Sequence, residues 1–196
     1  MKKTILIILL AAIFTVNSKA QPIEKELRLI NENRIDMNKS AMKVLGGWAV
    51  TNIATGTYGM LKTDGTTRYF HEMNAAWNSV NLVIAGFGYY GAKNSDTNLS
   101  LSETIRESNN LDKLLLFNAG LNIGYVATGA YLWERGMRKQ SDRQTGYGQS
   151  LILQGAFLFV FDTVLYLVRN SKREKIRSLL NNIQFNGTRA SFYYTF

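Results

Sequence analysis

The charged residues of this chain avoid four long stretches of its sequence. The 196 residues include 23 Lys and Arg and 14 Asp and Glu. Three stretches hold none of these charges and the fourth holds only Asp162: residues 44–61, 73–92, 114–133 and 144–168. The only proline, Pro22, lies outside all four stretches. The fold must therefore accommodate four long, uncharged and unbroken segments.

Helices that cross a membrane would explain these segments. About 20 residues of low-polarity helix span the hydrocarbon core of a bilayer. A helix also satisfies its own backbone hydrogen bonds there. We therefore predict an all-α fold, a four-helix transmembrane bundle that forms a membrane domain over residues 44–168. Its spans are expected at about residues 44–61, 73–92, 114–133 and 148–168.

A soluble periplasmic helical bundle is the alternative. The mean hydropathy of the chain is only −0.11. The first three stretches also contain many Asn, Thr and Gly residues. A helix at the surface of a soluble protein, however, turns a charged or strongly polar face to water. None of the first three stretches can provide a charged face, which favours the membrane bundle.

The first 20 residues have the pattern of a bacterial signal peptide. Lys2 and Lys3 precede an apolar core at residues 5–16, and Ser18 and Ala20 are small residues at the positions before a cleavage site. We expect cleavage after residue 20 and a multi-pass protein of the bacterial cell membrane. With four spans, both termini of the mature chain would lie outside the cell.

Amphipathic segments flank the predicted membrane domain. Residues 21–43 repeat apolar side chains at helical spacing among charges, and we expect a helix that lies on the membrane surface. Residues 169–196 begin as a basic amphipathic extension that suits anionic headgroups. Asn186-Gly187 is a hairpin turn signal, so the chain is expected to end in a short hairpin or tail.

Turn and capping residues lie between the uncharged stretches. Asp64-Gly65 indicates a tight turn after the first stretch. Ser141 to Gln144 fits a capping box at the start of the fourth helix. Ser100 to Glu103 fits another, which predicts a short surface helix within residues 93–113.

Polar side chains inside the stretches are the main functional lead. They are Asn52, Asn74, Asn78, Asn81, Asn118, Asn122, Gln154 and Asp162. Amides that face lipid lose hydrogen bonds, so these residues should face the bundle interior. A carboxylate at the centre of a span costs about 2.5–3.5 kcal/mol on insertion scales. Asp162 is therefore expected near Asn78 and Asn122, either in a structural network that fixes helix register or in a polar site or ion path.

Two further groups of residues have expected roles. His71 and Glu72 form an interfacial polar pair at the start of the second stretch. Small residues repeat every four positions, which lets helix backbones approach each other in lipid. The predicted helix-packing residues are Gly47, Thr51, Thr55, Gly59, Gly120 and Gly124. The packing could be within one chain or between chains.

Several functional classes are excluded or disfavoured by composition. With no Cys and one His, the chain offers no disulfide scaffold, thiol nucleophile, Cys-ligated metal or conventional catalytic triad. Gly86 to Gly91 matches G-x-G-x-x-G, but it ends an uncharged helical stretch instead of following a strand. The basic residues are dispersed. We expect no enzyme, no metal or other cofactor and no nucleic-acid binding.

The pattern of Asn, Gly and aromatic residues extends across all four stretches. It reads VLGGWAVTNIATG (44–56), YFHEMNAAWNSVNLVIAGFGYYG (69–91), FNAGLNIGYVATGAYLWERG (117–136) and GYGQSLILQGAFLFVFD (146–162). Over about residues 30–170 the chain resembles a family of small uncharacterised bacterial multi-pass membrane proteins. The resemblance implies a helical membrane domain and no particular activity, so it assigns no role to any residue.

The functional prediction follows from these observations. We expect a non-enzymatic integral membrane protein with a structural or partner-binding role, in contact with the lipid bilayer and with a protein partner or further copies of itself. A small transporter or channel component, built on the intramembrane Asp and Asn cluster, is the competing prediction. A soluble periplasmic bundle is the third.

Overall fold

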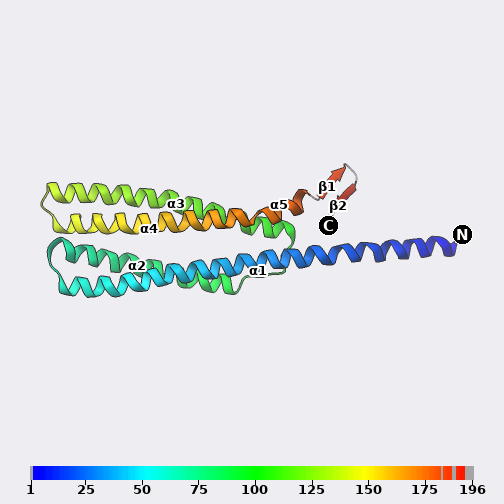
Figure 1. Ribbon diagram of the computed structural model, residues 1–196, viewed down its shortest axis with the longest axis horizontal. Coiled ribbons are helices and arrows are strands. Elements are labelled where there is room, and N and C mark those ends of the chain that lie inside the picture. Colours follow the sequence, from blue (N-terminus) through cyan, green and yellow to red (C-terminus); the bar gives the residue numbers. More distant parts are fainter. Residues whose placement is uncertain (1, 182, 187–188, 193–196) are drawn as a thin grey trace.

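The protein consists of four long helices arranged as two hairpins that lie side by side (Figure 1). The computed structural model describes the backbone of residues 2–181, 183–186 and 189–192, and the side chains of residues 23–174 and 176–178. The long helices are α1 (Lys2–Lys62), α2 (Gly65–Lys93), α3 (Leu101–Arg138) and α4 (Asp142–Lys172). The prediction of an all-α fold based on four long helices is confirmed.

Helix α1 is longer than the sequence predicted. It runs without interruption through 61 residues, so residues 21–43 are not a separate helix on a membrane surface. Leu27, Asn31 and Ile35 from this segment are buried instead. Asn31 Nδ2 donates to Thr104 Oγ1 of α3 at 2.8 Å. The segment continues the first helix because no residue between Pro22 and Gly46 breaks it and one face packs on α3. Cleavage after residue 20 stays a prediction.

Helix α3 also includes a segment that was expected to form a separate helix. Ser100 and Glu103 form the predicted capping box, but the helix that they start continues to Arg138. The prediction of a short, separate surface helix within residues 93–113 is therefore wrong. Ser141 caps α4 by accepting a hydrogen bond from the Gln144 amide.

The two hairpins meet mainly along α2 and α4. Glycine brings backbones together near the turns, which lie at the left in Figure 1. A Cβ added at Gly129 of α3 would lie 2.7 Å from the Gly148 carbonyl oxygen of α4. A Cβ at Gly146 of α4 would collide with the Thr66 carbonyl and the Phe70 amide of α2. These close approaches leave no room for a side chain.

The distribution of polarity is inverted relative to a water-soluble bundle. Asn78 is 0% exposed, whereas Phe87 on the same helix is 75% exposed. The buried polar or charged side chains outnumber the buried apolar ones among the described residues. Large apolar side chains instead cover the outside of all four helices: Val50, Tyr58, Leu61, Val80, Val83, Phe87, Leu116, Phe117, Ile123, Tyr131, Val160, Val164 and Leu167.

Length and apolarity alone single out one helix, where the sequence predicted four spans. Within the described residues, only Asp142–Ser178 is both long and apolar enough to cross a membrane. The uncharged stretches of α1, α2 and α3 fall short because Asn, Thr and Gly lower their hydropathy.

The C-terminal region follows α4 closely. Helix α5 (Glu174–Asn181) precedes strands β1 (Ile183–Asn186) and β2 (Arg189–Phe192). The two strands pair antiparallel, with Ile183 opposite Phe192. The Ile176 side chain is buried, so this predicted amphipathic extension places an apolar residue against the protein. The predicted turn residue Gly187 lies outside the described residues.

Candidate functional site

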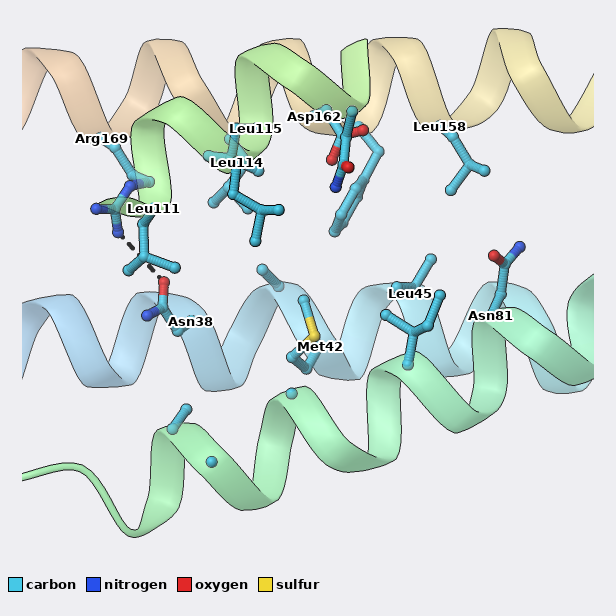
Figure 2. A pocket seen from close by; sticks show the side chains of 18 of the residues that line it. Asn38, Met42, Leu45, Asn81, Leu111, Leu114, Leu115, Leu158, Asp162 and Arg169 are labelled. Carbon is cyan, nitrogen blue, oxygen red and sulfur yellow. Dashed lines mark hydrogen bonds between the residues drawn. The ribbon is translucent and has the colours of Figure 1, made fainter. Parts of the chain in front are cut away.

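A cavity of about 670 Å³ lies between the two hairpins and is lined by all four long helices. It occupies the half of the bundle away from the two turns. Figure 2 shows Met42 and Leu45 of α1 facing Leu111, Leu114 and Leu158 across this space. The middle of the cavity is therefore apolar.

One wall of the cavity carries a buried carboxylate. Asn122 Nδ2 of α3 donates to Asp162 Oδ2 of α4 at 2.8 Å. Asn81 of α2 lies in the opposite wall (Figure 2). Asp162 is 6% exposed. It accepts a hydrogen bond from Asn122, and it forms no ion pair with any of the described residues. The pair places a polar patch beside the apolar middle of the cavity.

Arginine side chains mark one end of the cavity. Arg169 Nε of α4 forms a buried ion pair with Asp112 Oδ1 of α3 at 3.0 Å. Its Nη1 donates to Asn38 Oδ1 of α1 at 3.2 Å, a bond drawn in Figure 2. Arg173 Nη1 lies 2.7 Å from Asp112 Oδ2. This network ties α1, α3 and α4 together at the cavity end.

Arg34 of α1 lies at the same end and is also buried, at 8% exposed. Its Nε donates to Asn31 Oδ1 at 3.1 Å. Burial lowers the pKa of the Arg34 guanidinium from its ordinary value, and the charge of Glu107 partly opposes that effect. The guanidinium therefore lies in a desolvated place, where a cation is costly unless an anion accompanies it.

The other half of the bundle contains a connected network of amides. Trp48 Nε1 of α1 donates to Gln154 Oε1 of α4 at 3.0 Å, and Gln154 Nε2 donates to Asn74 Oδ1 of α2. Asn74 Nδ2 then donates to Asn52 Oδ1 at 2.9 Å. Trp48 also stacks on Phe157, with ring centroids 3.7 Å apart. Three helices are joined through side chains that satisfy one another.

The predicted polar residues thus separate into two groups. Asn78 donates to the Asn74 carbonyl, and Asn81 donates to Asn78 Oδ1 at 3.3 Å. Asp162 meets Asn122 as expected, but no bond to Asn78 is recorded. Asn118 lines the cavity with no recorded side-chain hydrogen bond. The amides from α1, α2 and α4 form one network and the Asn122–Asp162 pair another.

His71 and Glu72 contact different neighbours instead of each other, and their interfacial placement stays a prediction. The Tyr147 hydroxyl donates to Glu72 Oε1 at 2.6 Å. The His71 ring instead packs where Gly59 has no side chain. Adjacent residues on a helix point about 100° apart, so each of the two finds a different neighbour.

Most of the predicted helix-packing residues face away from the chain's own helices. A Cβ at Gly47, Gly120 or Gly124 would meet nothing within 4 Å. Thr51 and Thr55 are exposed and donate to carbonyls of their own helix. Only Gly59 packs as predicted. The close contacts are made by glycines that the spacing rule did not select, which are Gly56, Gly129, Gly136, Gly146, Gly148 and Gly155.

Sequence reasoning also missed the charged end of the cavity. Asp112 and Arg169 lie just outside the uncharged stretches and Arg34 lies ten residues before the first, where charges were assigned to loops and surface helices. The sequence pattern that could have located this charged end lies on α1. Asn31, Arg34 and Asn38 follow one another at spacings of three and four residues, so they share a helix face with buried apolar residues.

The comparisons with known proteins place the chain in a family. A family model described as a family of unknown function, DUF6992, matches residues 44–163. The chain belongs to this family, and the match covers the first three uncharged stretches and most of the fourth, while Arg34 and Arg169 lie outside it. No curated protein and no solved structure matches the chain. Within the described residues, no group of His, Cys, Asp or Glu side chains is arranged to hold a metal ion.

Proposed function

We propose that this member of the DUF6992 family is a non-enzymatic integral membrane protein that binds an amphipathic molecule between its two helical hairpins. The observation that carries the proposal is the inverted polarity of the bundle. Buried amides satisfy one another inside, while large apolar side chains face outward. A soluble protein rarely exposes so continuous an apolar surface to water.

Charges at both ends of the helices support a membrane-spanning arrangement. The turn end carries Lys62, Arg68 and Arg138, and the opposite end carries Lys93 and Lys113. Twenty helical residues between such charges extend about 30 Å, which is the thickness of the hydrocarbon core. Interhelical amide bonds are also a usual means of joining helices in lipid.

The ligand is proposed from the cavity. Its volume of about 670 Å³ falls in the range of small-molecule sites, about 300–1,000 Å³. The middle is lined by leucines and Met42, and the end by Arg34 and Arg169. An apolar body with a polar head matches this distribution, and a lipid is the class of molecule that such a bundle would meet in a membrane.

Cysteine labelling tests the membrane arrangement directly, because the natural chain has no cysteine. Gly124→Cys lies on the outer face of α3, midway along its uncharged stretch, and Lys139→Cys lies at the turn before α4. A water-soluble maleimide should label Lys139→Cys and spare Gly124→Cys. Equal labelling, or release of the protein by an alkaline carbonate wash, would favour the soluble bundle.

A second labelling condition tests the predicted orientation. With the termini outside, the turn that contains Lys139 lies in the cytoplasm. An impermeant maleimide should then label Lys139→Cys only after the cells are permeabilised. Labelling of intact cells would reverse the orientation and leave the membrane arrangement unchanged.

Cavity filling tests ligand binding. Ala41 is buried in the cavity wall of α1, and Ala54 is exposed on the same helix. Native mass spectrometry of the protein extracted in mild detergent should detect a lipid adduct. Ala41→Phe should remove that adduct, whereas the control Ala54→Phe should retain it. Retention in both variants would place the lipid outside the cavity.

A proton or cation path is the second candidate function. Asp162 favours it, since this carboxylate lines the cavity and has a single recorded donor, Asn122. Asp162→Asn preserves size and hydrogen bonding but removes the titratable charge. Vesicles that contain the wild-type protein would then show ion flux. Transport would be supported if this flux is lost in Asp162→Asn while the abundance of the protein is unchanged. Equal flux in both, or none in either, would leave the pair as a structural contact.

A further inference from the structure

Four charged side chains are buried in the described part of the chain: the carboxylates Asp112 and Asp162 and the guanidinium groups Arg34 and Arg169. Asp112 and Arg169 form an ion pair, and Asp162 accepts a hydrogen bond from an asparagine. Arg34 differs. Its recorded side-chain bond is to the neutral Asn31, and no ion pair is recorded for it among the described residues. Since buried cations need a counter-charge, this place in the fold calls for an anion.

The surroundings of Arg34 strengthen that conclusion. Arg34 lines both the large cavity and a second one of about 390 Å³, whose wall also includes Lys172 and Arg173. Asp112 is already shared between Arg169 and Arg173. Two acidic side chains, Glu107 and Asp162, line the larger cavity, and Glu174 lines the smaller one. None of these three carboxylates forms an ion pair with Arg34 among the described residues, although the charge of Glu107 acts on it from beyond ion-pair distance. The guanidinium is therefore available to an anionic ligand.

We infer that Arg34 binds the anionic head of the cavity ligand, a phosphate or carboxylate group attached to an acyl chain. This inference rests on the proposed function and specifies its ligand. The acyl chain would extend from Arg34 past Met42 and Leu45 into the apolar middle of the cavity. The planar guanidinium suits the head because its N–H groups match two oxygens of a phosphate or carboxylate at once.

The test compares two lipids that differ only in the head. The full chain, purified in a non-ionic detergent and stripped of bound lipid, is titrated with dioleoyl phosphatidic acid, with dioleoylglycerol and with inorganic phosphate. Native mass spectrometry reports binding, and thermal unfolding reports stabilisation. The wild-type protein should bind phosphatidic acid about 10- to 100-fold more tightly than dioleoylglycerol, the range expected for hydrogen bonds to a charged group.

Variants on one helix separate the site from general charge. Arg34→Gln should abolish the preference for phosphatidic acid and retain dioleoylglycerol binding. Arg28→Gln is the matched control, because Arg28 is exposed and pairs with Glu32 of its own helix. It should behave as the wild type. Arg34→Lys keeps the charge without the planar fork and should keep part of the preference, and it carries the comparison if Arg34→Gln does not fold.

The outcomes separate this inference from the proposed function. Equal binding of both lipids to the wild type, unchanged in Arg34→Gln, would overturn the role of Arg34 while the cavity ligand stands. Binding of neither lipid, with stabilisation by inorganic phosphate that Arg34→Gln loses, would overturn the lipid and assign Arg34 to a free anion. No response to any probe would overturn both.

Discussion

The two halves of the bundle hold their helices at different distances. In the turn half, helices approach until the backbone of one occupies the side-chain space of another, as at Gly129 and Gly148. In the other half, side chains such as Leu45 and Leu114 keep the hairpins apart around a cavity of about 670 Å³. The size of the residues on the facing surfaces therefore decides how closely the helices approach. We call the turn half the closed half, and the half that contains the cavity the open half.

The polar chemistry differs between the halves in the same way. Amides of the closed half bond to each other and to carbonyls of their own helices. The open half contains the buried charges, with Asp162 in its wall and Arg34 at its end. Fully paired amides fix helix register, whereas a charge without a counter-charge is a place for a binding partner.

The largest expected effect is a side chain added where the closed half has none. In Gly148→Ala, the new Cβ would lie 2.5 Å from the Gly129 carbonyl oxygen. Because that atom belongs to the backbone, helices α3 and α4 must separate, and we expect the unfolding free energy to fall by about 3 kcal/mol, the upper end of overpacking costs. Thermal unfolding in detergent measures it.

The control for Gly148→Ala is Gly124→Ala on α3. A Cβ at Gly124 meets nothing within 4 Å, so this variant should unfold at the wild-type temperature or slightly above it. Equal losses in the two variants would mean that glycine contributes through helix flexibility instead of close packing.

A smaller effect is expected from breaking the amide network of the closed half. Gln154→Leu leaves the Trp48 indole N–H without its acceptor and leaves Asn74 Oδ1 with only the 3.5 Å bond from Asn78 Nδ2. A buried group without a partner costs about 1–3 kcal/mol. Asn118→Leu changes an amide of the open half that has no recorded bond, and it should cost much less. Unfolding temperatures of the two variants, measured side by side, decide whether the halves differ as described.

The sequence was informative where a property belongs to one helix. The lack of charge in residues 73–92 and 114–133 predicted long helices, and Asn74 and Asn78 were correctly expected to be buried. Ser100 and Glu103 located the start of α3 because a capping box is a local structure. Such features depend on residues three or four positions apart, which a single sequence displays.

The sequence failed where two helices must be placed relative to each other. Gly120 and Gly124 have the four-residue spacing of a packing motif, whereas Gly129 and Gly136 are seven residues apart, yet only the second pair meets α4. Which face turns inward depends on the rotation of the whole helix, so periodicity alone could not choose. The cavity was also not foreseen, because its volume depends on the separation of the two hairpins.

The smallest expected effect concerns the small residues on the outside of the bundle. A Cβ added at Gly47 or Gly120 would have no neighbour within 4 Å. In a membrane, Gly47→Leu and Gly120→Leu should each change the unfolding free energy by no more than about 0.5 kcal/mol, as expected for surface sites. A clear loss of folded protein would contradict the placement of these residues.

Small residues on lipid-facing helices also allow close contact between separate chains, so chemical cross-linking provides the second measurement. Less cross-linked dimer at an unchanged unfolding temperature would assign this surface to a contact between copies, whereas unchanged cross-linking would show that it faces lipid alone.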